Sequence, residues 1–366
     1  MNTVNTTLDE NRLHEITVMP LNARQIQTVN GYVVFVTATV LNVLLVIVLR
    51  SERNLKLKAY SNVLTLNCAC DLFYTVISTL TDMQYEVDNR GIFFVCGGVF
   101  NWLPTHWQFF GAWLDLSGMY LSMFVIPIIF YTRYALVIRK KELDAWRLVT
   151  LSMIPIAASL TLSSFVAAGL VTTQRQRRFS CAELFSNPIW TYGGASIDKC
   201  LYLDAENVYS RWYTFIYILF AVINYALLIY FNMRIFAHMS RLSDGVLVSK
   251  FQRQLSLLMA MQLILPLMCT SFPTLMVILT LFARVRLVGA NIFAALFVQW
   301  IPLINPLLAL IFVANYRRRV ARLVVRVATC GRAARIRTAT TENPLTKKFG
   351  THQASDEPSG ALKWGA

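Results

Sequence analysis

The sequence predicts an all-α membrane protein, a bundle of seven transmembrane helices. Hydrophobic residues make up 56% of the 366 residues and charged residues only 14%, whereas a soluble domain typically contains about 25% charged residues. Seven apolar segments each have the roughly 20 residues that a helix needs to cross the hydrocarbon core of a bilayer. The apolar runs are continuous rather than alternating, so they favour helices over the strands of a β-barrel.

The predicted spans follow one another closely along the chain. Their approximate limits are residues 30–49, 60–83, 105–138, 148–171, 212–236, 255–282 and 288–313. The third span is longer than one crossing requires, so we expect it to tilt or to project beyond the membrane. No repeat of hydropathy relates the two halves of this set, and a transporter or channel is therefore the lower-ranked alternative.

The distribution of basic residues predicts the orientation of the bundle. If the N-terminus lies outside, the inner loops and the tail carry 23 Lys and Arg residues and the outer segments carry ten. Cytoplasmic loops are enriched in basic residues, so we expect an outer N-terminus and an inner C-terminus. The formal charge of +15 then indicates contact with an anionic inner leaflet rather than with nucleic acid.

Polar segments flank the spans at both ends of the chain. Residues 1–29 are expected to be extracellular; they contain no recognisable cleavable signal peptide and carry Asn5 in an acceptor triplet for N-glycosylation. Residues 314–330 place valines and a leucine at helical spacing among arginines, which predicts an amphipathic helix on the membrane surface. This segment ends at Cys330, a candidate for palmitoylation, and residues 331–366 have the composition of a disordered cytoplasmic tail.

Three cysteines, Cys96, Cys181 and Cys200, fall in predicted outer loops, where the compartment is oxidising and disulfides form. A bridge from Cys96 to either Cys181 or Cys200 would tie the second outer loop to the top of the third helix, and the sequence leaves the pair open. That loop, residues 172–211, mixes acidic and basic side chains. Its composition fits a lid over a binding cavity and a solvated connection equally well.

A few polar side chains lie inside the predicted spans, where a central charged group costs about 2.5 to 3.5 kcal/mol and needs a partner or a task. Asn42, Asp71 and Asn305 lie at comparable depths in the first, second and seventh spans. We expect them to form one hydrogen-bonded activation switch, which a sodium ion near Asp71 can join. The alternative is that they only hold helices together. Apart from that ion, the sequence predicts no cofactor and no metal site.

Arg133 and Tyr134 lie at the inner end of the third span, in Phe130-Tyr131-Thr132-Arg133-Tyr134. A guanidinium group at this place either snorkels to the headgroups or points across the inner mouth of the bundle, where it can meet a partner protein. Prolines remove backbone hydrogen bonds, so we expect kinks that let the inner ends of the sixth and seventh helices swing. These prolines are Pro266, Pro273, Pro302 and Pro306.

Several motifs, spread from about residue 30 to residue 319, form a set that points to one family. They are Leu41-Asn42-Val43-Leu44-Leu45, Lys58-Ala59-Tyr60-Ser61-Asn62 and Cys70-Asp71-Leu72-Phe73-Tyr74 in the first two spans, Gly118-Met119-Tyr120-Leu121 and the Arg133 motif in the third, Gln252, Gln254, Gln262, Pro266 and Pro273 at the sixth, and Ile301-Pro302-Leu303-Ile304-Asn305-Pro306 with Asn315-Tyr316-Arg317 at the seventh. The set resembles the nematode seven-transmembrane serpentine chemoreceptors, which are distantly related to rhodopsin-like G-protein-coupled receptors.

The resemblance implies a receptor that binds a small molecule or peptide in an outer cavity and activates a heterotrimeric G protein at its inner face, through Arg133 and Tyr134. It also implies a plasma-membrane protein of sensory neurons, with the cilium as one expected location, and an environmental ligand. Two positions depart from rhodopsin-like receptors. Thr132 replaces the acid that precedes Arg133, and Ala309 stands where the seventh helix of those receptors has a tyrosine. An ionic lock between Arg133 and an adjacent acid is therefore absent.

Asp115 supports an alternative function, an amine or neuropeptide receptor. Asp115 precedes Arg133 by 18 residues, about 27 Å along a helix, so it is expected near the outer cavity, where amine receptors similar to this arrangement keep a carboxylate for the ammonium group of the ligand. Trp113 and Tyr120 would add cation–π contacts, and Phe272 is expected in the same site. The alternative is a purely structural role, in which Asp115 pairs with a neighbouring helix. An enzyme is not expected, because no protease motif such as His-Glu-x-x-His is present.

Overall fold

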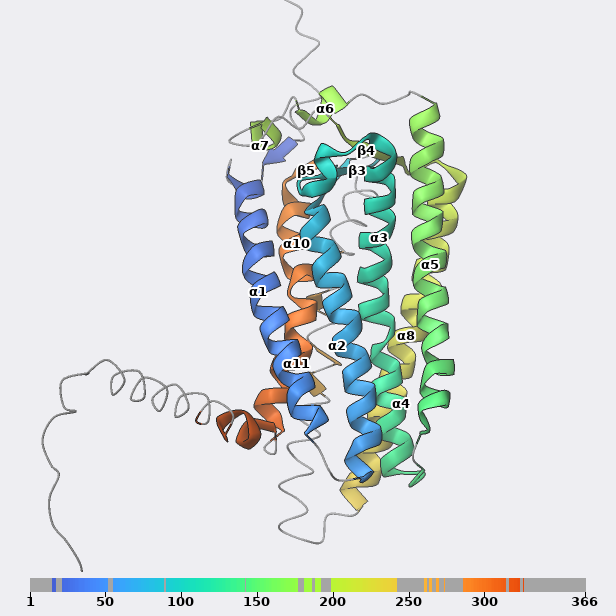
Figure 1. Cartoon of the computed structure of the whole chain (residues 1–366). Helices are drawn as coiled ribbons and strands as arrows, with labels where there is room; N and C mark the ends of the chain where they lie inside the picture. Colours follow the sequence, from blue (N-terminus) through green and yellow to red (C-terminus); the bar gives the residue numbers. More distant parts are fainter. Residues whose placement is uncertain are drawn as a thin grey trace, which may run out of the picture. The chain divides into compact units, whose positions relative to one another are not determined.

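The computed structural model describes most of the chain up to residue 325 (Figure 1). The described residues are 15–17, 22–51, 55–88, 90–141, 143–176, 181–185, 188–191, 199–241, 260–261, 263–264, 268–269, 273, 286–313, 316–322 and 325. The chain divides into two compact units, Met1–Arg318 and Arg319–Ala366. The bundle belongs to the first unit. Of the second unit, only residues 319–322 and 325 are described, so Cys330 and the predicted tail lie outside the described residues, as does Asn5.

Long helices run side by side in the first unit (Figure 1). They are α1 (Ala23–Arg50), α2 (Leu55–Thr81), α3 (Thr105–Phe124), α4 (Ile126–Val137), α5 (Ala145–Arg175), α8 (Val208–Arg241), α10 (Ala290–Gln299) and α11 (Ile301–Phe312). Within the described ranges, six helical segments are long and apolar enough to span a membrane, and α3 with α4 and α10 with α11 each count as one. They confirm six of the predicted spans. The remaining one, residues 255–282, lies almost wholly outside the described residues.

Apolar side chains face outward from the helices as well as inward. On α8, Phe215, Val222 and Met233 are 61%, 61% and 64% exposed. A soluble bundle would bury such side chains, but a helix surrounded by lipid tails leaves them outside. Toward the interior, α3 and α5 share a buried cluster that contains Leu116 and Leu162.

Two of the spans are interrupted, and each interruption lies two residues before a proline. The third span breaks at Val125 between α3 and α4, before Pro127, and the last span breaks at Trp300 between α10 and α11, before Pro302. Proline has no N–H to donate to the carbonyl four residues earlier, and its ring crowds that carbonyl. The backbone adapts with tighter bonds: the N–H of Ile128 donates to Val125 O, and the N–H groups of Leu303 and Ile304 both donate to Trp300 O, all at 3.1 Å.

One end of the bundle carries β-strands, which the sequence did not predict (Figure 1). The strands β2 (Met83–Asp88), β3 (Gly91–Cys96) and β4 (Leu201–Asp204) form an antiparallel sheet in the order β2-β3-β4, while β1 (Glu15–Thr17) pairs in parallel with β5 (Arg286–Val288). A Cβ atom at Gly91 would lie 2.2 Å from the carbonyl oxygen of Leu203. Glycine therefore allows β4 to approach β3 at this position. We call this end of the bundle the sheet end.

The described parts of the long loop fold onto the sheet end rather than into solvent. They contain α6 (Cys181–Phe185), α7 (Pro188–Thr191) and β4. Trp190 is 2% exposed and packs with Ala23 and Ile292. The guanidinium of Arg24 donates to the Trp190 carbonyl at 2.7 Å and lies 5.3 Å from the centre of its ring. These contacts favour the lid interpretation of the loop over a solvated connection.

The disulfide joins Cys181 to Cys200, with 5.8 Å between their Cα atoms. The prediction that Cys96 takes part is wrong. Cys96 ends β3 and points into the core, where its Sγ lies 3.8 Å from Met83 Sδ. Burial and the nearby carboxylate of Asp115 raise the pKa of the Cys96 thiol to about 12. The bridge therefore closes a loop within residues 181–200 and does not tie this loop to the third helix.

Candidate functional site

A buried carboxylate group in the middle of the bundle joins three helices. Asp71 of α2 is 0% exposed. Its Oδ1 accepts a hydrogen bond from Ser122 Oγ of α3 at 2.5 Å, and its Oδ2 accepts from Asn67 Nδ2 at 2.7 Å and from Asn305 Nδ2 of α11 at 3.3 Å. Asn67 and Asp71 share a face of α2, since they are four residues apart. We call these four residues the Asp71 cluster.

Asn42 donates its hydrogen bonds to backbone carbonyls and not to a member of the Asp71 cluster. Its Nδ2 donates to Pro302 O of α11 at 3.0 Å and to Ala38 O at 2.9 Å. In a regular helix the carbonyl of residue 302 accepts from the N–H of residue 306, and Pro306 has none. Asn42 therefore satisfies a carbonyl that Pro306 leaves without its helical donor. The structure brings Asp71 and Asn305 together as predicted, whereas Asn42 connects α1 to the backbone of α11.

The region around Asp71 offers several oxygen acceptors. Within the described part of the chain, Oδ1 of Asn42 and Oδ1 of Asn67 are both buried without a hydrogen-bond partner. Carboxylate, amide and hydroxyl oxygens are the ligands that hard cations prefer. The residues present therefore fit the chemistry of a small monovalent cation such as sodium.

Asp115 lies closer to the sheet end and is also buried, at 3% exposure. Thr81, the last residue of α2, donates to its Oδ1 at 3.2 Å, and the hydroxyl of Tyr85 on β2 donates to its Oδ2 at 2.7 Å. Burial and the charge of Asp115 raise the pKa of Tyr85 well above its ordinary value, so the phenol keeps the proton that it donates. Asp115 thus fixes α3 to the junction of α2 and β2, and both of its oxygens have donors.

The other residues of the predicted ligand site contact different elements. Trp113 points toward α5, where its Nε1 donates to Ser164 Oγ at 3.2 Å. Tyr120 is 1% exposed, and its hydroxyl lies 2.6 Å from that of Tyr213 on α8. Phe272 lies outside the described residues. The described contacts therefore do not gather Asp115, Trp113 and Tyr120 around one ligand.

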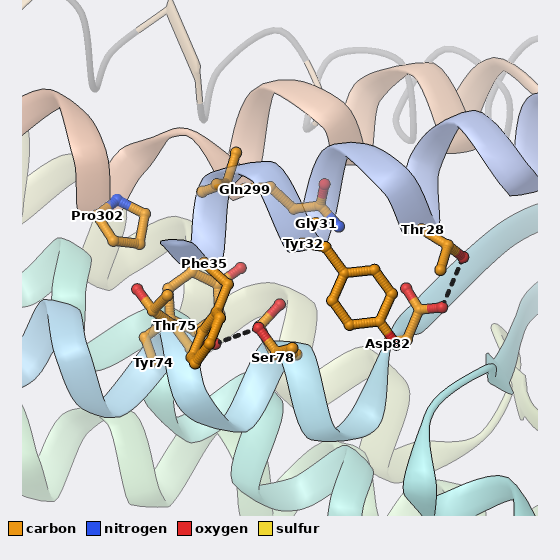
Figure 2. Close-up of a pocket in the computed structure, with 12 residues that line it drawn as sticks. Thr28, Gly31, Tyr32, Phe35, Tyr74, Thr75, Ser78, Asp82, Gln299 and Pro302 are labelled. Atoms are coloured by element: carbon orange, nitrogen blue, oxygen red, sulfur yellow. Dashed lines mark hydrogen bonds between the residues drawn. The ribbon is translucent and has the colours of Figure 1, made fainter. Parts of the chain in front are cut away.

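A narrow crevice lies near the sheet end between α1, α2 and the α10–α11 junction (Figure 2). Thr28 of α1 donates to Asp82 Oδ2 at 2.7 Å across it. Burial raises the pKa of Asp82 above its ordinary value, while the bond from Thr28 and the charge of Arg24 oppose that shift. Sequence reasoning missed this site, because Asp82 lies at the very end of the predicted span 60–83, where an acidic residue is expected to be solvated. The lining residues are Thr28, Gly31, Tyr32, Val34, Phe35, Tyr74, Thr75, Ser78, Thr79, Asp82, Gln299 and Pro302.

Arg133 lies near the opposite end of the bundle, which we call the Arg133 end. Arg133 is 3% exposed, and its Cζ lies 6.0 Å from the centre of the Phe130 ring. It is therefore buried in the protein and does not extend to the bundle surface, as snorkelling would require. Tyr134 is 7% exposed, its ring centre lies 5.5 Å from that of Phe231 on α8, and the guanidinium of Arg139 lies over it at 5.5 Å.

The predicted kinks are tested in part. Pro302 is the second residue of α11, which follows the break at Trp300, and Pro306 lies inside α11 without ending it. Pro266 lies outside the described residues, and Pro273 is described without its neighbours. The break before Pro127 was not predicted, although the proline is visible in the sequence.

Comparison with known proteins identifies the family. Residues 27–321 match the family described as serpentine type 7TM GPCR chemoreceptor Str. The crystal structure of squid rhodopsin is similar, with a TM-score of 0.57 over 86% of this chain and 89% of that one; the identity of 11% shows the fold alone. No curated protein sequence matches the chain. Because the family match covers most of the length, the chain is a multi-pass membrane receptor, not an enzyme, and it belongs to the serpentine Str chemoreceptor family of G-protein-coupled receptors.

Proposed function

We propose that this receptor binds a small molecule or peptide on the side of the sheet end, and that binding opens the Arg133 end to a heterotrimeric G protein. The ligand must prefer the signalling arrangement of helices to the resting one, since only such a difference in affinity shifts the populations. Family membership supports the general role. The class of ligand, the coupling to a G protein and the chemosensory role are our proposals.

One observation carries the proposed mechanism: the Asp71 cluster lies between the two helix breaks. Ser122 precedes the break at Val125 by one turn, and Asn305 follows the break at Trp300 by about one turn. A broken helix can change direction there with little repacking elsewhere. Rearranging the Asp71 cluster would thus change the angle between α3 and α4, and α4 carries Arg133.

We further propose that the sheet end is extracellular and that the receptor resides in the plasma membrane of sensory neurons, including that of the cilium. The disulfide between Cys181 and Cys200 at the sheet end supports this orientation, because disulfides form in oxidising compartments. The excess of basic residues in the loops and tail of the opposite side supports it too. Epitope tags at Met1 and Ala366 on intact cells test the orientation, and tags on the same side would contradict it.

A sodium ion near Asp71 is a second component of the proposal. Its ligands would be oxygens of Asp71, Asn67 or Ser122, and the ion would balance a carboxylate that has no cationic partner among the described residues. Activation should then become less sensitive to the ligand as sodium replaces a larger cation such as choline. An activation curve that stays the same in both salts would exclude this role.

The amine-receptor alternative receives no support from the described contacts. An ammonium group that binds Asp115 would have to displace the donor from Tyr85 or from Thr81. A neutral ligand, or one bound elsewhere on the sheet side, does not need this exchange.

The decisive test of the proposed function is a ligand screen with a G-protein readout. The receptor is co-expressed with heterotrimeric G proteins and exposed to volatile molecules, amines and peptides, while surface expression is followed in parallel. A response that requires both the receptor and the G protein supports the proposal. A receptor that reaches the surface and activates none of the G-protein classes with any ligand class would contradict it.

A further inference from the structure

A positively charged cavity opens at the Arg133 end, between the last turns of α4 and the first turns of α5. It contains about 750 Å³ of empty space including its open side. Arg139, Lys141 and Arg147 line it together with Tyr131 and Thr150, which carry hydroxyl groups. The remaining lining residues, Ala135, Leu143 and Leu151, are apolar. The lining thus combines three cations and two hydroxyl groups with an apolar wall.

The turn between the two helices brings these cations together. Lys140 has a φ of +50°, which reverses the chain after α4. The N–H of Lys141 then donates to Ala135 O at 3.1 Å, so the turn folds back against the end of α4. Arg147 lies in the first turn of α5, which begins at Ala145. The backbone therefore holds Arg139, Lys141 and Arg147 around one space.

The described lining of the cavity carries a net positive charge, although Asp144 lies nearby at the start of α5. None of its described lining residues is acidic, and the three cations make no ion pair with a carboxylate within the described part of the chain. Arg139 lies over the Tyr134 ring, but a cation–π contact leaves the positive charge in place. Three cations around a concave site repel one another, and an anion that enters is attracted by all of them.

The surroundings of the cavity indicate that this anion belongs to a lipid. The beginning of α5 presents apolar side chains outward: Trp146 is 78% exposed, Val149 49%, Met153 51% and Ile154 68%. Tryptophan is enriched at the level of the headgroups, and aliphatic side chains below it face acyl chains. A lipid could thus place its headgroup in the cavity while its chains lie along α5.

We propose that this cavity binds the headgroup of an anionic phospholipid that bears phosphate monoesters. The lipid would bridge the end of α4 to the start of α5 and so hold the helix that carries Arg133. This proposal rests on the proposed function in one respect, namely that the Arg133 end faces the cytoplasm. The binding itself does not require a G protein.

The test uses the full-length receptor in nanodiscs of phosphatidylcholine, with fluorescent phosphatidylinositol bisphosphate as the probe. Substituting Gln for any one of Arg139, Lys141 and Arg147 should weaken binding roughly fivefold, and the triple variant roughly a hundredfold, given the usual attraction of one basic side chain to an anionic lipid surface. Lys140→Gln is the matched control, because it removes the same charge from the same turn but does not line the cavity. Its binding should change less than twofold.

Each other outcome would overturn the proposal. If Lys140→Gln weakens lipid binding as much as the lining variants do, the lipid is attracted by a diffuse surface charge. If the triple variant binds the lipid as tightly as the unaltered receptor, the cavity is not the binding site. Binding of soluble inositol trisphosphate as tight as that of the lipid would assign the cavity to a free polyphosphate. Thermal unfolding of each variant checks that the fold is intact. Because no G protein is present, a receptor that binds the lipid but fails to signal contradicts the proposed function and not this site.

Discussion

Replacing Asp71 by Asn tests whether the Asp71 cluster controls the balance between two receptor states. The substitution keeps the shape of the side chain and removes its charge. The amide can present one acceptor oxygen to the two donors that now meet Oδ2, Asn67 and Asn305, but its NH₂ group then faces Ser122 in place of Oδ1. One charge-assisted bond is lost or reversed, and the other two become neutral ones of roughly half the strength.

The expected magnitude follows from these contacts. Hydrogen bonds between membrane helices contribute about 0.6 kcal/mol on average and up to about 1.7 kcal/mol. Losing one such bond and weakening two others should change the free-energy difference between two receptor states that differ in these bonds by about 1 to 2 kcal/mol. This corresponds to roughly a 5- to 30-fold change in the ratio of their populations. We expect either a shifted ligand dose response or altered basal activity of that size.

The assay combines G-protein activation in cells with thermal unfolding of the solubilised receptor. Thr65→Val is the matched control, because the hydroxyl of Thr65 donates to the carbonyl of Ser61 on the same helix at 2.9 Å and not to the carboxylate. The reasoning is refuted if Asp71→Asn leaves basal activity, dose response and unfolding temperature unchanged. It is also refuted if Thr65→Val shifts activation as much as Asp71→Asn does.

Five further substitutions follow from the contacts described above. Arg133→Ala should abolish G-protein activation while surface expression stays within about twofold, and unchanged coupling would remove its assigned role. Asp115→Asn should reduce only responses to cationic ligands if the amine alternative holds; an equal loss for neutral ligands would indicate a structural role. Asn42→Val should destabilise the receptor by about 1 to 3 kcal/mol by leaving a carbonyl unsatisfied, and Pro306→Ala should relieve much of that loss; additive effects in thermal unfolding would contradict this coupling. Cys96→Ala should leave the disulfide intact in a non-reducing peptide map, whereas a lost bridge would restore the pairing that the structure excludes.

Helix length and hydrophobicity made the spans predictable, but they did not reveal where the spans break. The segment after the second span was read as the end of a helix and a loop. Residues 83–88 in fact form β2, which pairs with β3. The sequence of β2, Met-Gln-Tyr-Glu-Val-Asp, alternates apolar and polar residues, so the period of two that marks a strand was visible but overlooked. The sequence of β3 shows no such alternation. The break at Val125 was readable in principle from Pro127, yet prolines occur in membrane helices without ending them, as Pro306 does.

The part of the candidate site that could be predicted consists of polar residues that are rare inside the apolar spans. Asp71 and Asn305 are rare polar residues inside spans, and they do meet. Ser122 was missed, because serine is common in membrane helices and usually bonds its own backbone. Tyr85, which donates a hydrogen bond to the carboxylate of Asp115, was also missed, because it lies on β2, a strand that was not predicted.

The bond from Asn42 to the carbonyl of Pro302 has a consequence for how relatives of this receptor diverge. A proline at position 306 leaves that carbonyl without its helical donor, and in this structure the side chain of Asn42 on α1 donates to it instead. Selection should therefore act on positions 42 and 306 as a pair. Relatives that lose the amide at the first position should have regained an N–H at the second, and the two changes should appear on the same branches of the family tree.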